Sequence, residues 1–187
     1  RRNPGQADLL EIFQALGRVH QRAARTQEAL AVWTRLENLF PGDARVQEQI
    51  AVTLVEEGQA AEALPRYETL AKGTTDDYRR TVYQMDTAEL KIKLNRASEG
   101  IADLESLLAK LNPESWLFRE VRRRIEDVFL RSDDQDGLAK YYTAWLGKNP
   151  EDVEAMARLA KSLARQARVP QAQEWLHKAL KLAPSRK

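Results

Sequence analysis

The chain has 187 residues, 43% of them hydrophobic and 31% charged, and its formal net charge is +2. This composition predicts a folded protein, and it excludes a strong overall charge that would by itself direct the chain to nucleic acid or a membrane surface. No hydrophobic run reaches the roughly 20 residues that span a bilayer, and without cysteine the chain has no disulfide or thiolate chemistry.

The chain begins Arg1-Arg2-Asn3-Pro4-Gly5, without an initiator methionine or a hydrophobic signal sequence. We therefore interpret it as a segment of a longer protein. We expect no membrane insertion by this segment, and we take the cytoplasm as its default location. The first helical pattern has a hydrophobic face made of Leu9, Leu10, Phe13, Leu16 and His20. The next pattern, over residues 27–39, has a buried side made of Leu30, Trp33, Leu36 and Leu39.

Turns that contain proline separate the later helices. These turns are Pro41-Gly42-Asp43, Asn112-Pro113-Glu114-Ser115 and Asn149-Pro150-Glu151-Asp152. Each ends one helix, because proline cannot continue it, and places acidic or capping side chains at the start of the next. Shorter turns are marked by Gly58, Asn95, residues 132–137 and Val169-Pro170. Without strand signals, the pattern predicts an all-α chain of about ten helices.

A period of 34 residues relates the helices at each end of the chain. Ala29, Trp33 and Leu36 recur as Ala63, Tyr67 and Leu70. Further along, Ile125, Phe129, Leu138, Tyr142, Trp145 and Pro150 recur as Leu159, Leu163, Ala172, Leu176, Ala179 and Pro184. A repeat of this length is typical of stacked helix pairs, each of which buries its hydrophobic face against its neighbours.

These residues resemble the tetratricopeptide repeat family, whose pattern is W-x₂-L-G-x₂-Y, then A-x₃-F, then P. The first unit matches the pattern with Phe13, Leu16, Gly17, His20, Ala29, Trp33 and Pro41. The last unit matches with Met156, Leu159, Ala160, Leu163, Ala172, Leu176, Ala179 and Pro184. Small residues such as Gly17 stand where two helices cross. The resemblance implies a right-handed α-solenoid of about five antiparallel helix pairs, in a single domain over residues 1–187 with units at approximately 7–43, 44–76, 77–114, 115–150 and 151–184.

The middle of the chain departs from this pattern. Leu70 is followed by its equivalents Leu107 and Trp145 after 37 and 38 residues, so seven extra residues interrupt the period. In the fourth unit Arg122 occupies a position that the family usually fills with a large hydrophobic side chain. We expect Val121, Ile125, Val128 and Phe129 to form the buried stripe there, with Trp116 extending it backwards.

We expect no enzymatic activity, cofactor or metal site. His20 occupies a core position of the repeat, and His177 lies on a solvated helix face. The acidic pairs Glu56-Glu57 and Asp133-Asp134 lie near helix ends, where solvation is the default. The sequence contains no phosphate-binding glycine loop and no metal-ligand spacing.

The family that the chain resembles binds extended peptides or helices in a groove lined by the first helix of each pair. Projected onto this chain, the groove is enriched in cations at both ends. We predict that the peptide-binding residues are Arg18, Arg22, Arg123, Arg124, Arg158, Lys161 and Arg165. Arginine fits carboxylates, so a protein partner with an acidic segment is expected. The alternative is that these are ordinary solvated faces, in which Glu120 and Arg124 or Glu154 and Arg158 pair within a helix.

Two other partner classes remain open. Nucleic acid is disfavoured, because Glu120, Glu126 and Asp127 interrupt the basic patch around Arg119, Arg122, Arg123 and Arg124. The Lys and Asn signature of arrays that bind the acidic C-terminus of heat-shock chaperones is also missing, since Gln14, Arg18 and Gln49 stand at its positions.

Self-association through the terminal helices is the second alternative. Leu176 fills a repeat position, and its neighbour Trp175 either packs on the preceding helix or is covered by another repeat or chain.

Overall fold

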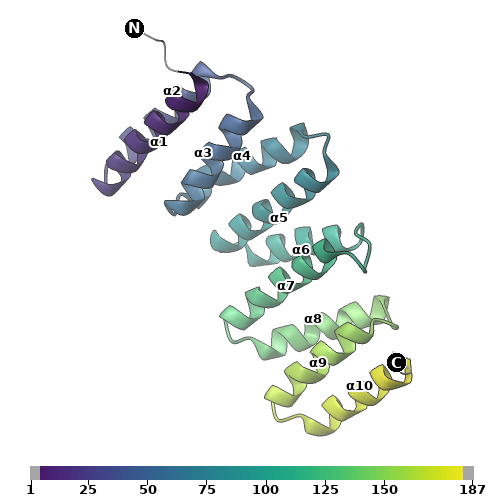
Figure 1. Cartoon of the computed structure of the whole chain (residues 1–187). Helices are drawn as coiled ribbons and strands as arrows, with labels where there is room; N and C mark the ends of the chain where they lie inside the picture. Colours follow the sequence, from purple (N-terminus) through teal and green to yellow (C-terminus); the bar gives the residue numbers. More distant parts are fainter. Residues whose placement is uncertain (1–4, 183–187) are drawn as a thin grey trace. The chain divides into compact units, whose positions relative to one another are not determined.

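The computed structural model describes residues 5–182, and these residues form ten α-helices joined by short loops (Figure 1). The predicted all-α fold of five helix pairs is confirmed. The chain divides into two compact units, Arg1–Pro113 and Glu114–Lys187. The single domain over residues 1–187 stays a prediction. No helix among the described residues is long and apolar enough to cross a membrane.

The first unit contains three helix pairs, in which helices adjacent in sequence are neighbours in space. The helices are α1 (Gln6–Arg22), α2 (Thr26–Leu39), α3 (Ala44–Glu56), α4 (Ala60–Gly73), α5 (Asp77–Lys93) and α6 (Ala97–Leu108). Asp43 begins α3 by accepting hydrogen bonds from the backbone N–H groups of Arg45 and Val46, at 2.9 and 3.2 Å. Asp76 caps α5 in the same way through the N–H of Arg79.

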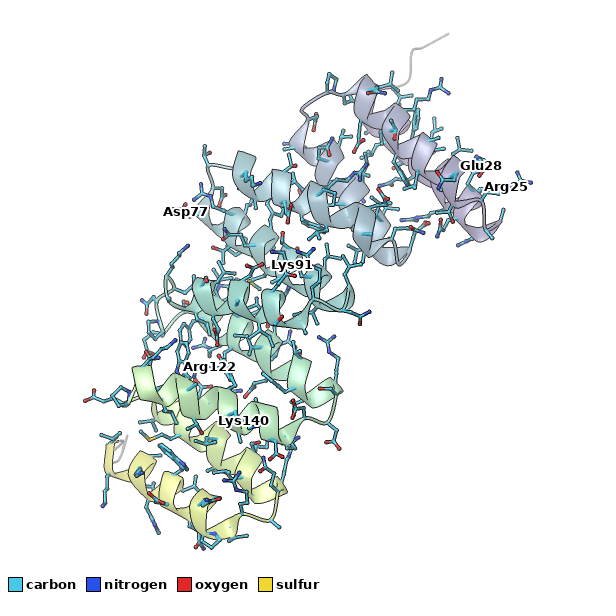
Figure 2. The ribbon with its side chains drawn as sticks, turned by 180° about the vertical axis from the view of Figure 1, so that it is seen from behind. Arg25, Glu28, Asp77, Lys91, Arg122 and Lys140 are labelled. Carbon is cyan, nitrogen blue, oxygen red and sulfur yellow. The ribbon has the colours of Figure 1, made fainter. Side chains whose placement is uncertain are left out.

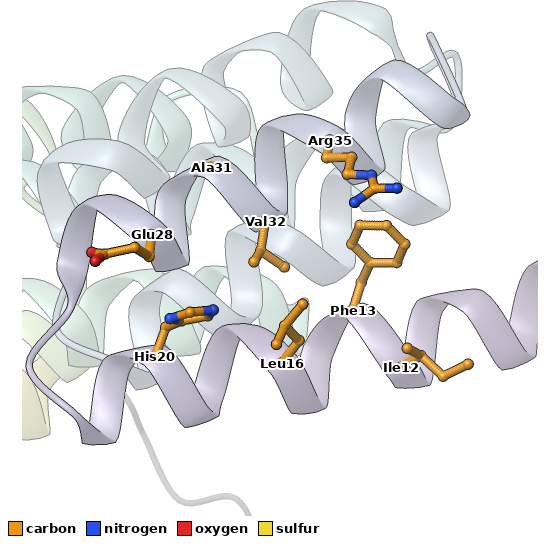
Figure 3. Close-up of a pocket in the computed structure, with 8 residues that line it drawn as sticks. All are labelled: Ile12, Phe13, Leu16, His20, Glu28, Ala31, Val32 and Arg35. Atoms are coloured by element: carbon orange, nitrogen blue, oxygen red, sulfur yellow. The ribbon is translucent and has the colours of Figure 1, made fainter.

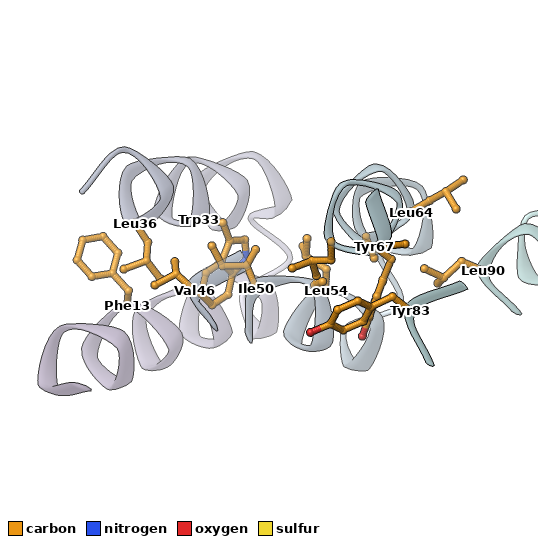
Figure 4. Packing of buried hydrophobic residues seen from close by; sticks show 14 of the residues in the cluster. Phe13, Trp33, Leu36, Val46, Ile50, Leu54, Leu64, Tyr67, Tyr83 and Leu90 are labelled. Carbon is orange, nitrogen blue, oxygen red and sulfur yellow. The ribbon is translucent and has the colours of Figure 1, made fainter. Parts of the chain in front are cut away.

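The core of the first unit runs continuously from one helix pair to the next (Figure 4). Trp33 and Leu36 of α2 lie in one cluster with Val46 and Ile50 of α3, and all four are at most 1% exposed. The same cluster continues through Tyr67 of α4 and Tyr83 of α5. A helix pair therefore obtains its buried surface from the next pair as well as from itself, as the 34-residue period predicts.

Gly17 is small because Trp33 occupies the space beside it. A Cβ atom added at Gly17 would lie 2.3 Å from Cζ2 of the Trp33 ring, far inside van der Waals contact. Gly100 of α6 plays the same part against α5, since its Cβ would lie 2.6 Å from the carbonyl oxygen of Ala88. The expectation that Gly17 marks a close helix crossing is confirmed.

The second unit contains two helix pairs. Its helices are α7 (Trp116–Arg131), α8 (Gln135–Lys148), α9 (Val153–Arg165) and α10 (Val169–Leu182). Its core is made of Phe118, Val121, Ile125, Leu138, Tyr142, Met156, Leu159 and Leu163. The residues of this core that belong to α7 and α9 lie at helical spacing, so both helices turn one hydrophobic stripe inward.

Four residues that were predicted to be buried are largely exposed. They are Leu16, Leu39, Trp116 and Leu176, with exposed fractions of 43 to 53%. Trp116 is the first residue of α7. Phe118, two residues later, is buried in its place and packs against the Trp145 ring at a centroid distance of 6.2 Å. Leu39 ends α2, where the following Phe40 packs on the core instead.

Leu16 and Leu176 are exposed for a different reason: they lie on faces of α1 and α10 that no other described helix covers. Trp175 is half-buried, and the Lys178 ammonium lies 4.4 Å from its ring centroid. The exposed hydrophobic residue of this helix is therefore Leu176 rather than Trp175. The predicted last repeat position, Pro184, lies outside the described residues.

Arg122 departs from the family pattern, yet its side chain is buried, with 1% of the residue exposed (labelled in Figure 2). Its guanidinium pairs with Asp152, the N-cap of α9, and lies 4.8 Å from the Phe118 ring centroid. The Trp145 indole N–H donates to the same carboxylate at 2.8 Å. A cation and its counter-ion thus take the place of a hydrophobic contact and hold the start of α9 against α7.

Alanine substitution at a crowded and at an open helical glycine is predicted to have opposite effects on stability. Gly17→Ala places a methyl group inside the Trp33 ring and should lower the free energy of unfolding by about 1–3 kcal/mol. Gly147 of α8 is the matched control, because its Cβ would meet no atom within 4 Å. There, Gly147→Ala should raise stability by about 0.5–1 kcal/mol through helix propensity. Urea unfolding of both variants measures the difference, and an equal gain at both sites would contradict the packing argument.

Removing the charge of Asp152 is predicted to cost more than removing Arg122 itself. Asp152→Asn keeps an acceptor for the cap but leaves a buried cation without its main partner, which should cost about 3 kcal/mol. Arg122→Leu restores the hydrophobic residue of the family pattern and removes a buried Nε atom that has no hydrogen-bond partner among the described residues. Its cost should be below about 1.5 kcal/mol. Chemical unfolding that ranks Arg122→Leu as the worse variant would overturn this interpretation.

The contribution of Asp152 should be lost in acid. Burial by itself raises the Asp152 pKa, but hydrogen bonds from Arg122, the Ala155 N–H and Trp145 outweigh burial and lower it overall. A carboxyl whose pKa is lower in the folded than in the unfolded chain stabilises the fold above the unfolded pKa of about 3.9 and loses this stabilisation as the pH falls through its folded pKa. The stability difference between the native chain and Asp152→Asn should therefore be constant near neutrality and shrink below about pH 4. A difference that stays constant from pH 7 to pH 3 would be inconsistent with this pairing.

Candidate functional site

A groove of about 380 Å³ lies within the second unit, between α7, α8 and α9. Its floor is hydrophobic and comes from Leu130 of α7, Leu138 of α8 and Ala157 of α9. Its cationic edge is formed by Arg158, Lys161 and Arg165 of α9. We call this feature the C-terminal groove. It contains three of the seven residues predicted from the sequence to bind a peptide.

The repeat pattern explains why these three cations lie together. Arg158, Lys161 and Arg165 are spaced by three and four residues, so they fall on one side of α9. The opposite side of the helix carries Met156, Leu159 and Leu163, all buried. Burial of this hydrophobic stripe in the core therefore directs the cations into the groove.

Arg158 is held in place by acidic neighbours. Its guanidinium pairs with Glu126 of α7 and, at 2.6 Å, with Glu154 one turn earlier on α9. The Tyr142 hydroxyl donates to the other oxygen of Glu126 at 2.5 Å. Burial lowers the Arg158 pKa, but the hydrogen bonds to Glu126 and Glu154 outweigh it and raise that pKa overall. Arg158 is thus a fixed cation whose charge is already compensated.

Polar contacts also fix the last turns of α9 against the start of α8. The Ser162 hydroxyl donates to the backbone carbonyl of Gln135 at 3.0 Å, and the Gln166 side-chain amide donates to the same oxygen at 2.7 Å. Ser162 is 2% exposed, so this contact is shielded from water. Because Lys161 and Arg165 flank Ser162 on α9, their backbone positions are set by these bonds.

Lys161 and Arg165 are the cations of the groove that can receive an outside partner. Both are exposed, and neither forms a salt bridge with another residue of the described part of the chain. They stand above a hydrophobic floor, with Arg158 neutralised beside them. Chemically, such an arrangement offers hydrogen bonds to carboxylates together with hydrophobic contact for a neighbouring side chain.

The other predicted residues do not line this groove. Arg123 and Arg124 lie on α7, where Arg123 pairs with Glu120 at 2.7 Å and Asp127 at 2.5 Å, and Arg124 pairs with Glu120 at 3.1 Å. Hydrogen bonding from Arg123, followed by that from Arg124, lowers the Glu120 pKa despite partial burial. For these two arginines the structure shows the intrahelical pairing that was the alternative expectation.

Arg18 and Arg22 belong to α1 of the first unit. The Arg18 guanidinium lies 3.5 Å from the Glu56 carboxylate of α3, and both side chains are about half exposed. Arg22 is exposed in the last turn of α1. These residues are thus part of an exposed surface between α1 and α3 rather than of the C-terminal groove.

Sequence reasoning missed the floor of the groove and the role of Glu126. Leu130 follows the inward-facing Phe129 and is 40% exposed, so it stands outside the core spacing of α7. The signal in the sequence for this floor was a leucine that lies outside the helical spacing of the hydrophobic stripe. Glu126 had been interpreted as an interruption of a basic run, whereas it organises Arg158 and Tyr142. No group of three or more potential metal-ligating side chains that could hold a metal ion occurs among the described residues.

Comparison with family models and with curated proteins found no match. Comparison with solved structures gave matches over nearly the whole chain. A structure of MamA is 13% identical, covers 94% of this chain and 92% of its own, and has a TM-score of 0.51. A structure described as the nearly identical TPR-like repeats of a putative kinesin light chain from Podospora anserina is 15% identical, covers 92% of this chain and 94% of its own, and has a TM-score of 0.52. Such low identities establish the fold alone, and by that measure the chain has the fold of the tetratricopeptide repeat proteins.

Proposed function

We propose that this chain is a non-catalytic protein-interaction scaffold that binds an acidic, amphipathic peptide segment in the C-terminal groove. The observation that carries the proposal is the position of Lys161 and Arg165, two cations without a salt bridge to any described residue, above a hydrophobic floor. A tetratricopeptide repeat fold is in keeping with a protein partner. The ligand is expected to be extended or helical.

The charge balance of the groove favours an anionic ligand. The lining holds three cations and two carboxylates, a net charge of +1. Glu126 and Glu154 pair with Arg158, and Glu154 also pairs with Arg122, so the cations without a salt bridge to a described residue are Lys161 and Arg165. Two carboxylates of a ligand can each hydrogen-bond one of these side chains, and Arg165 can hold a carboxylate through two parallel N–H donors. A leucine or aromatic side chain between the carboxylates would then cover Leu130 and Ala157, the exposed hydrophobic residues of the lining.

A protein partner is favoured over nucleic acid by the state of the arginine run on α7. Arg122 is buried against Phe118 and paired with Asp152, while Arg123 and Arg124 are paired with acidic residues of their own helix. Phosphate binding there would require breaking these pairs. Steep weakening of binding to single-stranded RNA with salt, at an affinity above that for the acidic peptide, would favour nucleic acid instead.

Charge reversal in the groove tests the proposal. The probe is a fluorescent peptide in which leucines alternate with pairs of glutamates, and its counterpart has lysine for each glutamate. The double variant Lys161→Glu/Arg165→Glu should weaken binding of the acidic peptide at least about tenfold in fluorescence anisotropy, because two attractive contacts become repulsive. The native chain should not bind the lysine counterpart.

The matched control is Lys140→Glu/Lys148→Glu, which makes the same change in net charge at exposed positions of α8 outside the groove. This control should retain the affinity of the native chain. Equal weakening in both double variants would show a nonspecific charge effect and would refute the groove as the site. So would unchanged binding in Lys161→Glu/Arg165→Glu.

A further inference from the structure

The first helix pair carries a second, mainly hydrophobic groove of about 480 Å³ between α1 and α2 (Figure 3). Ile12, Phe13, Leu16 and Val32 form its hydrophobic lining. Next to it on α1, Val19 is 62% exposed, and Ile12 itself is 55% exposed. We call this surface of α1 and α2 the N-terminal face. Such a run of exposed aliphatic side chains on one side of a helix marks an interaction surface.

The repeat shows how the same surface is used one unit later. Each of the α1 residues Ile12, Leu16, Val19 and His20 has its equivalent 34 residues further on, in α3. These equivalents are Val46, Ile50, Thr53 and Leu54, which are at most 2% exposed. Val46, Ile50 and Leu54 lie in the cluster that contains Trp33 and Leu36 of α2. The N-terminal face therefore has the composition of an internal repeat junction whose covering helix is missing from the described residues.

His20 is a polar residue of this face. Its Nδ1 atom is buried and has no hydrogen-bond partner among the described residues. The side chain lines the same groove, near Glu28 (Figure 3). Because the chain by itself already buries this atom, an outside partner does not reach it, and what the face lacks is hydrophobic cover.

Helix α10 carries the complementary half of a repeat junction. Ala29 of α2 and Ala172 of α10 are equivalent buried alanines, and four residues later come Trp33 and Leu176. Trp33 is 1% exposed because α3 covers it, whereas Leu176 is 44% exposed. A further turn along α10, Leu180 is 69% exposed. The surface of α2 on which α3 packs therefore has an equivalent on α10, and no described helix packs on that equivalent surface.

We propose that the N-terminal face of one copy of this chain binds α10 of a second copy, head to tail, in the register of an internal repeat junction. One substitution pattern supports a second copy as the occupant. Inside the first unit Glu37 of α2 pairs with Arg66 of α4 at 2.8 Å. In the head-to-tail junction, α10 of one copy takes the place of α2, and α1 and α2 of the second copy take the places of α3 and α4. The position of Glu37 is then occupied by Leu180 of the first copy, and the position of Arg66 by Val32 of the second. Both members of the ion pair are thus replaced by hydrophobic residues, one on each of the two surfaces.

A second pair predicts how salt acts on this junction. The internal contact between Arg18 and Glu56 corresponds, in the same register, to Lys161 of one copy and Arg22 of the other. These like charges are exposed and repel each other, so salt should screen the repulsion while leaving the hydrophobic contact in place. Association should therefore strengthen with salt, opposite to the behaviour of the acidic peptide in the C-terminal groove.

Sedimentation equilibrium of the whole chain over a range of concentrations tests the proposal. The average mass of the native chain should rise with concentration, and more steeply at higher salt. Ile12→Glu on the N-terminal face and Leu180→Glu on α10 should each weaken association at least about tenfold, because a charge would be buried in a hydrophobic contact. Both positions are more than half exposed, so circular dichroism should show an unchanged fold. Ala144→Glu, an exposed change on α8, is the matched control and should associate like the native chain.

Mixing the two variants separates head-to-tail binding from other arrangements. Ile12→Glu retains an intact α10, and Leu180→Glu retains an intact N-terminal face, so an equimolar mixture should recover association and stop at a dimer. A native chain that remains monomeric at all concentrations would overturn the proposal. It would also fail if Ile12→Glu alone still associated, since α10 would then pair with itself, or if salt weakened association. Both variants keep the residues of the C-terminal groove, and because Lys161 also lies at the junction, peptide binding is measured at concentrations at which the chain is monomeric.

Discussion

A helix pair in this chain carries more hydrophobic surface than it can bury within itself, and the rest of the structure depends on that constraint. Trp33 shows it most directly: one side of its ring fills the space left by Gly17 in the same pair, and it is completely covered only because α3 of the next pair lies against it. Burial is thus shared between neighbours, and the stability of each pair includes the contact with the next. Wherever a described pair has no neighbour on one side, hydrophobic residues at core positions are exposed.

Departures from the repeat pattern show how that shared burial is adjusted. At the junction between α7 and α9, an arginine occupies a hydrophobic position, and the cost of burying its charge is offset by Asp152 and by the aromatic rings of Phe118 and Trp145. The same carboxylate caps α9 through the Ala155 N–H. One side chain therefore sets where α9 begins and how it lies on α7. The orientation of Arg158, Lys161 and Arg165 follows from this, since all three are carried by that helix.

The two candidate surfaces differ in the kind of residue that forms them. The rim of the C-terminal groove is made of polar positions of α9 above a hydrophobic floor, and its proposed specificity comes from the two cations that have no salt bridge to a described residue. The N-terminal face and α10 use residues that the repeat makes hydrophobic, and their exposure comes from the lack of a described neighbour. Charge governs the first surface and hydrophobic burial the second. Salt is therefore expected to act on them in opposite directions, and Lys161 is the residue that the two surfaces share.

Local patterns in the sequence determined the helices, their pairing and most of the core, because helix spacing, caps and the 34-residue period depend on residues near one another in the chain. The same patterns placed Gly17 at a helix crossing and identified Arg122 as a departure. The pairs of Arg123 with Glu120 and Asp127, and of Arg158 with Glu154, follow from spacing within one helix. Only the tertiary structure decided that Glu126 of α7 also pairs with Arg158, and that Lys161 and Arg165 have no such partner among the described residues. Likewise, Leu16 and Ile50 occupy the same repeat position, and one is exposed while the other is buried because only the second has a helix packed against it.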